Sequence, residues 1–157
     1  MIIHATTRDE FFSSLIRDVL SEPASHLVIE LDCGMILHSN VKGTHATSRG
    51  RFLKTNRIVT SVKPKKAVQD FLVVSKFSNF EGRGYDYFAL IYTGCVYLLR
   101  KYLSCPIPKV NLWQDSGMDM CTEFVQKIIS RETDSMITPS KYLAKLVSSG
   151  DWENIDA

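Results

Sequence analysis

The hydrophobic and polar positions along the chain divide it into segments with two different periods. Apolar residues recur at the three- and four-residue spacing of an amphipathic helix over 8–21. Thr7 and Glu10 fit a capping box at the start of that helix. The segment 26–39 reads HLVIELDCGMILHS, two short β-rich runs around an Asp-Cys-Gly turn at 32–34, which predicts a β-hairpin.

The pattern downstream predicts one more strand and four more helices. Polar and basic residues with Gly, Ser and Thr fill 40–56, which predicts a long loop. The run RIVTSV at 57–62 predicts a strand. Helices are predicted within 64–80, 81–103, 121–130 and 138–150. Pro64 lies near the first turn of the first of these helices. The helix within 81–103 is apolar nearly all round, so it is expected to be central and buried. A helix, then strands, then helices indicates an α+β domain.

The composition changes this picture little. A chain of 157 residues that is 45% hydrophobic can bury one core, so we expect a single domain over 1–157. A net charge of +2 does not indicate a specific nucleic-acid binder. Eight cations nevertheless fall between Val41 and Gln69, where there is no Asp or Glu. They form either a solvated face or a docking surface for a polyanion or partner protein, with candidate residues Lys42, Arg49, Arg51, Lys54 and Arg57.

The sequence shows no targeting or membrane-spanning pattern. The N-terminus lacks the charged start and apolar core of a signal peptide, and no charge-free apolar run reaches about 18 residues. We therefore expect a chain made in a cytosol, without a transmembrane segment. The four cysteines form no C-x-x-C pair, so free thiols are expected rather than a zinc site or a disulfide framework.

Cys121 is the residue with the clearest chemical potential. It lies between a Gly-containing turn and a predicted helix, where unpaired N–H groups and the helix dipole favour a thiolate and can supply an oxyanion donor. The alternative is a small buried core residue, which is common for cysteine. A general base has to come from His4, His26, His38 or His45.

The predicted hairpin brings two of these histidines together. If its turn has three residues, Val28 faces His38. His26 and His38 then project from the same face as diagonal neighbours about 7–8 Å apart, close enough for one ring to orient the other. Glu30 shares the face of His26 by strand alternation and is the reserve orienting residue.

Six short motifs follow one another along almost the whole chain: SHLVIEL, ILHS, KGT, GYDYFAL, CTEFVQKI and TPSKYLAKL. This ordered set resembles the circularly permuted papain-like cysteine hydrolases of the NlpC-like superfamily, including small phage-encoded and bacterial members. It resembles lecithin retinol acyltransferase more distantly. The resemblance implies a permuted papain-like fold, in which a small antiparallel sheet packs against several helices.

The resemblance also implies catalytic roles. Cys121 corresponds to the nucleophile, His26 to the general base and His38 to the group that orients it. The sequence departs from the family pattern at two positions. Thr122 replaces a serine after the cysteine, and His38 stands where many members have a carboxylate.

Three further residues are candidates for lining the cleft. Tyr85 and Asp86 match the Tyr-Asp turn of the family, and Trp113 precedes Cys121 by eight residues. Packing within the core is the alternative for Trp113. Glu123 points away from the expected cleft and is predicted to accept backbone hydrogen bonds.

The expected function is hydrolysis of amide bonds through an acyl-enzyme, with peptidoglycan peptides as the substrate. The expected setting is a phage tail or other virion, or the host cytoplasm. No metal ion and no organic cofactor is required. Two alternatives stay open: a virion structural or interaction protein on the same fold, and an acyl hydrolase or transferase acting on lipids or thioesters.

Overall fold

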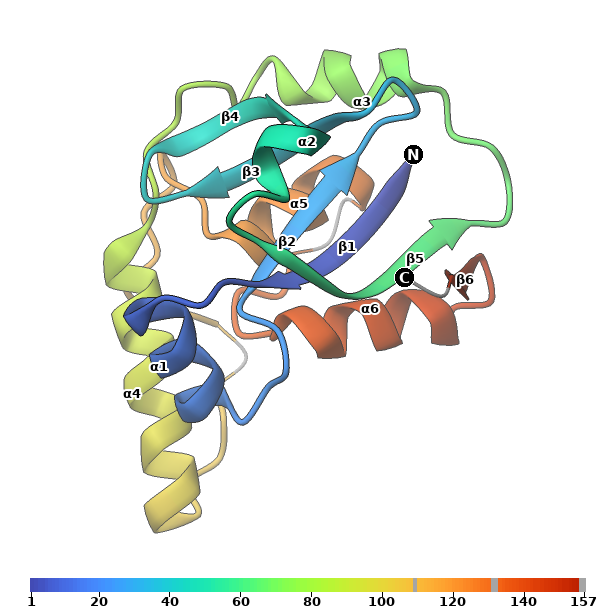
Figure 1. Cartoon of the computed structure of the whole chain (residues 1–157). Coiled ribbons are helices and arrows are strands. Elements are labelled where there is room, and N and C mark those ends of the chain that lie inside the picture. Colours follow the sequence, from blue (N-terminus) through green and yellow to red (C-terminus); the bar gives the residue numbers. More distant parts are fainter. Residues whose placement is uncertain (109, 131–132, 156–157) are drawn as a thin grey trace.

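Strands rich in β-branched residues pair into an antiparallel sheet at the centre of the molecule (Figure 1). The computed structural model describes residues 1–108, 110–130 and 133–155. Within them, the sheet has six strands in the spatial order β4-β3-β2-β1-β5-β6. The strands are β1 Ile2–Thr7, β2 His26–Glu30, β3 Met35–Asn40, β4 Gly43–Ser48, β5 Arg57–Pro64 and β6 Trp152–Ile155.

Helices cover both faces of this sheet and extend beyond one end of it (Figure 1). They are α1 Phe11–Leu20, α2 Arg49–Phe52, α3 Asp70–Phe77, α4 Tyr87–Leu103, α5 Cys121–Ile129 and α6 Pro139–Ser148. The α+β class predicted from the sequence is therefore confirmed. No helix in the described ranges is long and apolar enough to cross a membrane.

Two hydrophobic clusters lie on opposite faces of the sheet. The larger joins Leu27 and Ile29 of β2 to Phe124 of α5 and Leu143 of α6. Because strand side chains alternate between faces, the neighbouring residues of β2 point the other way. There they meet α2 in a smaller cluster that consists of Val28, Ile36 and Phe52.

The predicted hairpin of β2 and β3 forms with the expected turn. Ile29 pairs with Leu37 and Glu30 with Ile36, and the N–H of Leu31 donates to the carbonyl of Met35 at 2.9 Å. This register leaves three residues in the turn, as predicted.

The predicted long loop over 40–56 is wrong. Residues 43–48 form β4, which pairs with β3 along its whole length, and α2 follows. Pairing with β3 and burial of Phe52 decide the structure here, although the polar composition gives no strand signal. Gly43 begins β4 with a φ of 87°, and the carbonyl oxygen of Arg83 lies so close that a Cβ at Gly43 would be 2.5 Å from it.

Other boundaries also differ from the predictions. Thr7 belongs to β1, so the capping box with Glu10 does not form, and Glu10 itself is the N-cap. Pro64 ends β5 instead of opening a helix, because the edge strand β6 pairs with it at Trp152.

The helix predicted to be central and buried is exposed along one side. Ala89, Thr93 and Tyr97 of α4 are buried, but Phe88 is 68% exposed and Tyr102 75%. Part of its apolar surface is not covered by other described residues, because α4 contacts mainly α1 and extends past the sheet (Figure 1).

Candidate functional site

Cys121 is the first residue of α5, as the sequence predicted. Backbone and side-chain hydrogen bonds fix the segment before it. The hydroxyl of Ser39 donates to the carbonyl of Asp119 at 2.9 Å, and the N–H of Asp119 donates to the carbonyl of Gly84 at 3.2 Å. Glu123 accepts the N–H of Met120 at 3.2 Å, so the predicted backbone-capping role of Glu123 is confirmed.

The thiol of Cys121 lies where β2 and β3 separate. The recorded pairs between these strands are Ile29–Leu37 and Glu30–Ile36, and none involves the earlier residues of β2. The N–H of Leu27 is a hydrogen-bond donor to the Cys121 thiol instead, together with that of Thr122. Two backbone donors therefore converge on the sulfur at the N-terminus of a helix.

The protonation of Cys121 differs from the prediction of a thiolate. Burial raises the pKa of the thiol, and the carboxyl group of Glu123 adds to this increase. The N–H groups of Leu27 and Thr122 act in the opposite direction without outweighing burial. The predicted lowering of this pKa is therefore wrong, because the helix N-terminus lies inside the molecule.

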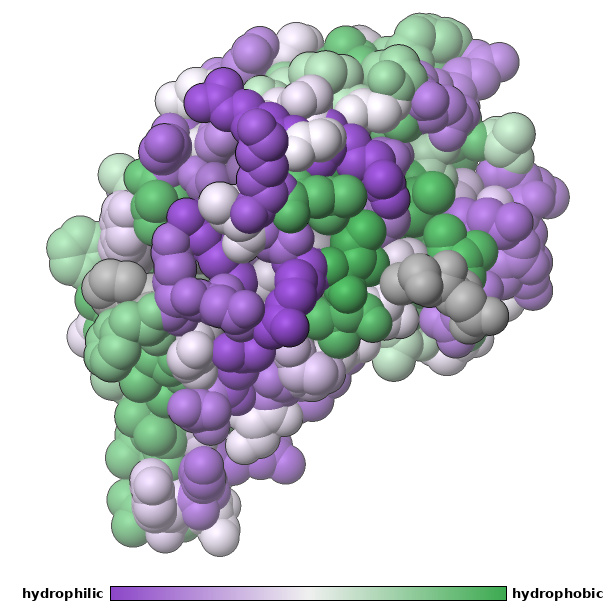
Figure 2. Space-filling model, in the orientation of Figure 1, coloured by the Kyte–Doolittle hydropathy of each residue, from purple (hydrophilic) through white to green (hydrophobic). Residues whose placement is uncertain are grey.

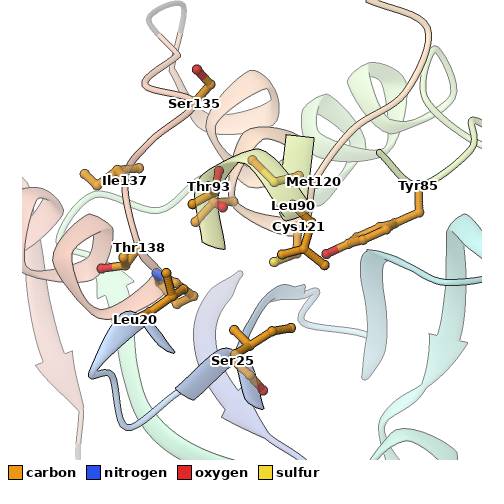
Figure 3. A pocket seen from close by; sticks show the side chains of 13 residues that line it. Leu20, Ser25, Tyr85, Leu90, Thr93, Met120, Cys121, Ser135, Ile137 and Thr138 are labelled. Carbon is orange, nitrogen blue, oxygen red and sulfur yellow. The ribbon is translucent and has the colours of Figure 1, made fainter. Parts of the chain in front are cut away.

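Cys121 borders a small cavity of about 30 Å³. Figure 3 shows the side chain of Tyr85 pointing toward Cys121 across this space. Burial, followed by the proximity of Cys121, raises the pKa of Tyr85 well above its ordinary value, so its hydroxyl is a neutral donor. The rest of the lining is mainly apolar and hydroxyl-bearing, and includes Ile16, Leu20, Leu90, Thr93, Ile137 and Thr138.

The two hairpin histidines are in contact. Nε2 of His26 lies 3.3 Å from Nδ1 of His38, and the two rings meet edge to face with centroids 5.6 Å apart. The contact between these two rings that the sequence predicted is therefore present, and the orienting role of His38 stays a prediction. Burial lowers the pKa of His26 to about 4 and that of His38 to about 2, so both rings are neutral near pH 7.

The hydrogen bonds around His38 indicate which nitrogen carries each proton. The Oδ1 atom of Asn40 accepts the N–H of Lys42 at 2.9 Å, so the NH₂ group of Asn40 faces Nδ1 of His38, at 3.4 Å. Nδ1 of His38 is therefore the acceptor, and His26 donates to it from Nε2. The lone pair of His26 is left on Nδ1.

Sequence reasoning named His45 as one of four possible bases but did not predict its contact with His38. Its ring lies against that of His38, with centroids 4.3 Å apart, because His45 pairs with His38 across β3 and β4. The sequence feature that could have predicted this contact is the two-residue turn between Asn40 and Gly43, because that turn sets the register of β3 and β4. Nε2 of His38 is buried without a hydrogen-bond partner among the described residues.

Leu27 lies between the Cys121 thiol and the histidine pair. Its N–H is directed to the Cys121 thiol, and His26 is the preceding residue of β2. The side chains of His26 and Leu27 point to opposite faces of the strand. In the described part of the chain, no hydrogen bond or electrostatic interaction joins the Cys121 thiol to an imidazole.

The reserve residue Glu30 lies elsewhere. It lies 2.8 Å from Nε2 of His4 and accepts Nε of Arg49 at 3.2 Å, and within the described residues no hydrogen bond joins it to His26 or His38. Nδ1 of His4 is 2.7 Å from the hydroxyl of Ser61. His4 and Glu30 therefore form a separate polar group on the sheet.

The other two cleft candidates differ in their surroundings. Asp86 is buried and structural, since it accepts the N–H groups of Ala89 at 2.8 Å and of Asp115 at 2.7 Å. Trp113 is 53% exposed and packs against Tyr92 on α4, away from the residues that line the cavity. Of the three candidates, Tyr85 alone lines it.

The basic residues lie in the turn before β4, in and just after α2, and at the start of β5. Glu30 partly neutralises Arg49, and Asp9 pairs with Arg57 at 2.7 Å. Lys42, Arg51 and Lys54 are exposed. The described residues contain no cluster of His, Cys, Asp or Glu arranged to hold a metal ion.

No protein-family model matches the sequence, and no curated protein matches it either.

Proposed function

We propose that this protein is a cysteine-dependent acyl hydrolase with Cys121 as the nucleophile. One observation carries the proposal. The thiol at the first position of α5 receives the N–H of Leu27, which is the residue next to a histidine whose Nε2 is already bonded to His38. A cysteine hydrolase needs a nucleophile, a base and an oriented base within one small region.

The proton transfers follow from the tautomers. Nδ1 of His26 takes the thiol proton as the sulfur of Cys121 bonds to the substrate carbonyl carbon. The oxyanion is held by the helix N-terminal N–H of Cys121, with the Tyr85 hydroxyl as a second donor. His26 then gives the proton to the leaving amine or alcohol as its bond to the carbonyl carbon breaks, and water hydrolyses the thioester by the same route.

The neutral resting state has a kinetic consequence. Because burial raises the pKa of Cys121 and lowers that of His26, the pair does not rest as thiolate and imidazolium. Deprotonation accompanies attack, and the base contributes roughly 10²–10⁴-fold to the rate. Because the His26 side chain points to the face of β2 opposite that of Leu27, the proposal requires the His26 ring to move toward the thiol when substrate binds.

The proposed substrate is an amide bond in a peptidoglycan peptide, cleaved by a phage-tail or other virion protein. This choice rests on the resemblance of the ordered motifs to the permuted papain-like hydrolases. A cavity of about 30 Å³ beside Cys121 suits an acyl residue with a very small side chain. Glycine or alanine next to the scissile bond meets that requirement.

A second function is favoured by a different observation. A buried thiol whose pKa is raised, and which interacts with no imidazole in the described ranges, is also what an inactive member of a hydrolase fold contains. On this alternative, the protein is a structural or interaction component of a virion.

Acylation by p-nitrophenyl acetate separates the two functions. We expect a single acetyl group on Cys121, located by peptide mass spectrometry, with formation at least about 10²-fold slower in His26→Ala. Acetylation of the exposed thiols Cys33, Cys95 and Cys105 serves as the internal reference and should not change in that variant.

His4→Gln is the matched histidine control, because His4 is a buried strand histidine bonded to Glu30 and Ser61 and has no proposed role. Peptidoglycan fragments then test the substrate, with Cys121→Ala as the blank. Full activity of Cys121→Ala would rule out Cys121 as the nucleophile, and Cys121 acetylation that is indifferent to His26 would favour the second function.

A further inference from the structure

One side of α4 is an apolar surface that the described residues leave exposed. Its residues share one face at helical spacing, and we call them the α4 stripe: Phe88, Ile91, Cys95, Leu98, Leu99 and Tyr102. Within the stripe Phe88 is 68% exposed, Ile91 54% and Tyr102 75%. Isolated apolar side chains on a surface are ordinary, whereas a contiguous exposed face indicates an interaction site.

The loop after α4 enlarges this surface. Trp113 lies against Tyr92 with ring centroids 5.6 Å apart, which places the loop beside the helix. Val110 is 59% exposed and Leu112 76%. Figure 2 shows the resulting hydrophobic area at the lower left, where Figure 1 places α4.

The charged residues of α4 itself have one sign. The sequence from Tyr87 to Gln114 contains no Asp or Glu. Arg100 and Lys101 are exposed in the last turn of α4. An apolar helix face with aromatic residues near its ends and cations in its last turn matches an interfacial helix that lies on an anionic bilayer.

We propose that the α4 stripe, with Val110, Leu112 and Trp113, docks on the surface of a bilayer that contains anionic phospholipid. The apolar side chains enter the boundary between headgroups and acyl chains, and Arg100 and Lys101 contact lipid phosphates. A second copy of the chain fits this surface less well, because its own α4 would bring Arg100 and Lys101 and contains no acidic residue to pair with them. The docking does not depend on the proposed hydrolase activity.

Vesicle binding tests the proposal directly. The purified protein is mixed with vesicles of equal parts phosphatidylcholine and phosphatidylglycerol, and its partition coefficient is measured by co-sedimentation. Leu99→Ser with Tyr102→Ser should lower that coefficient at least about tenfold. Arg100→Glu with Lys101→Glu should lower it on the anionic vesicles and leave the weaker binding to pure phosphatidylcholine little changed.

A matched control is available on α3, where Phe71 is 64% exposed and Leu72 50%. Phe71→Ser with Leu72→Ser removes the same kind of surface outside the stripe and should leave binding unchanged. Trp113 fluorescence should shift to shorter wavelength on anionic vesicles, and Trp113→Phe should remove the shift because Trp152 is buried. Far-UV circular dichroism verifies that each variant is folded.

Several results would overturn the proposal. They are no binding to anionic vesicles, equal losses in the stripe and α3 variants, and equal binding to neutral and anionic vesicles. A dimer in light scattering that Leu99→Ser with Tyr102→Ser dissociates would assign the stripe to a second copy instead.

Discussion

At the scale of single residues, burial decides which groups carry charge. Unfolding exposes His26 and His38 to water, where their ordinary pKa is 6.5, whereas the folded values are about 4 and about 2. The unfolded chain therefore binds more protons than the folded chain between these values. Each histidine contributes stability that is present above pH 6.5 and is lost as the pH falls toward its folded pKa.

The first prediction follows from this linkage. From about pH 6.5 down to about 4, the free energy of unfolding should fall by up to about 1.4 kcal/mol per pH unit for each of the two histidines. His26→Gln should reduce this slope, as measured by urea unfolding at a series of pH values. Identical slopes in wild type and variant would contradict the assignment.

The pH dependence that Glu123 gives to the stability has the opposite sign to that of the two histidines. Burial raises its pKa from 4.5 to about 7, so its contribution to stability is present below pH 4.5 and lost as the pH rises through 7. Glu123→Gln keeps an acceptor for the N–H of Met120 and removes the buried charge. We expect this variant to be more stable than wild type by up to about 3 kcal/mol at pH 8 and unchanged at pH 4, measured by urea unfolding; a loss of stability at both pH values would be the opposite result.

Some of these residues were predictable and others were not. The contact between His26 and His38 follows from a turn length and a two-residue period, which are both local properties of the sequence. The pKa of Cys121 depends on what lies around the helix N-terminus, and that includes residues far away along the chain such as Leu27 and Tyr85. Local sequence therefore gave the position of Cys121 on its helix but the wrong direction for its pKa.

At the scale of elements, Gly43 holds β4 against the loop that leads into α4. Its φ of 87° disfavours other residues, and a Cβ would be 2.5 Å from the carbonyl oxygen of Arg83. We expect Gly43→Ala to lower the free energy of unfolding by about 1–3 kcal/mol. Gly34→Ala is the control, because Gly34 has a φ of 78° but no neighbouring atom within 4 Å of its Cβ position.

Chemical denaturation measures both variants. Gly34→Ala should lose only the part that its backbone conformation causes. Equal losses at the two positions would mean that the close approach of Arg83 contributes nothing.

The elements that the sequence predicted are those with a strong internal period. The amphipathic helix α1, the hairpin strands and α5 have the apolar spacing that their burial requires. β4 lacks this signal, because its stability comes from pairing with β3 and not from its polar side chains. The edge strand β6 has only four residues, too few for a recognisable alternation.

At the scale of the whole molecule, the larger hydrophobic cluster connects most of the elements. It takes residues from β1, β2, β3 and β5 and from α3, α5 and α6. Such a shared core predicts one cooperative unfolding transition. In a Trp113→Phe background, the fluorescence of buried Trp152 and the far-UV circular dichroism should therefore report the same midpoint in urea.

An earlier midpoint in the circular dichroism would show that α1 and α4 unfold independently of this core.

The exposed side of α4 is a feature of the molecule that the sequence did not predict. Composition showed that the helix is apolar nearly all round, and a buried position was the direct inference. Whether the chain itself covers such a helix depends on how the other elements pack, and no local pattern contains that information.

The hydrogen bonds between β4 and the loop before α4 also protect the outer edge of the sheet. The N–H of Thr44 donates to the carbonyl of Arg83 at 2.8 Å, and its carbonyl accepts the N–H of Gly82 at 2.9 Å. An edge strand with free groups is a template for another chain. The loop occupies those groups at the start of β4, so Gly43→Ala should also promote self-association, seen as light scattering that grows with protein concentration.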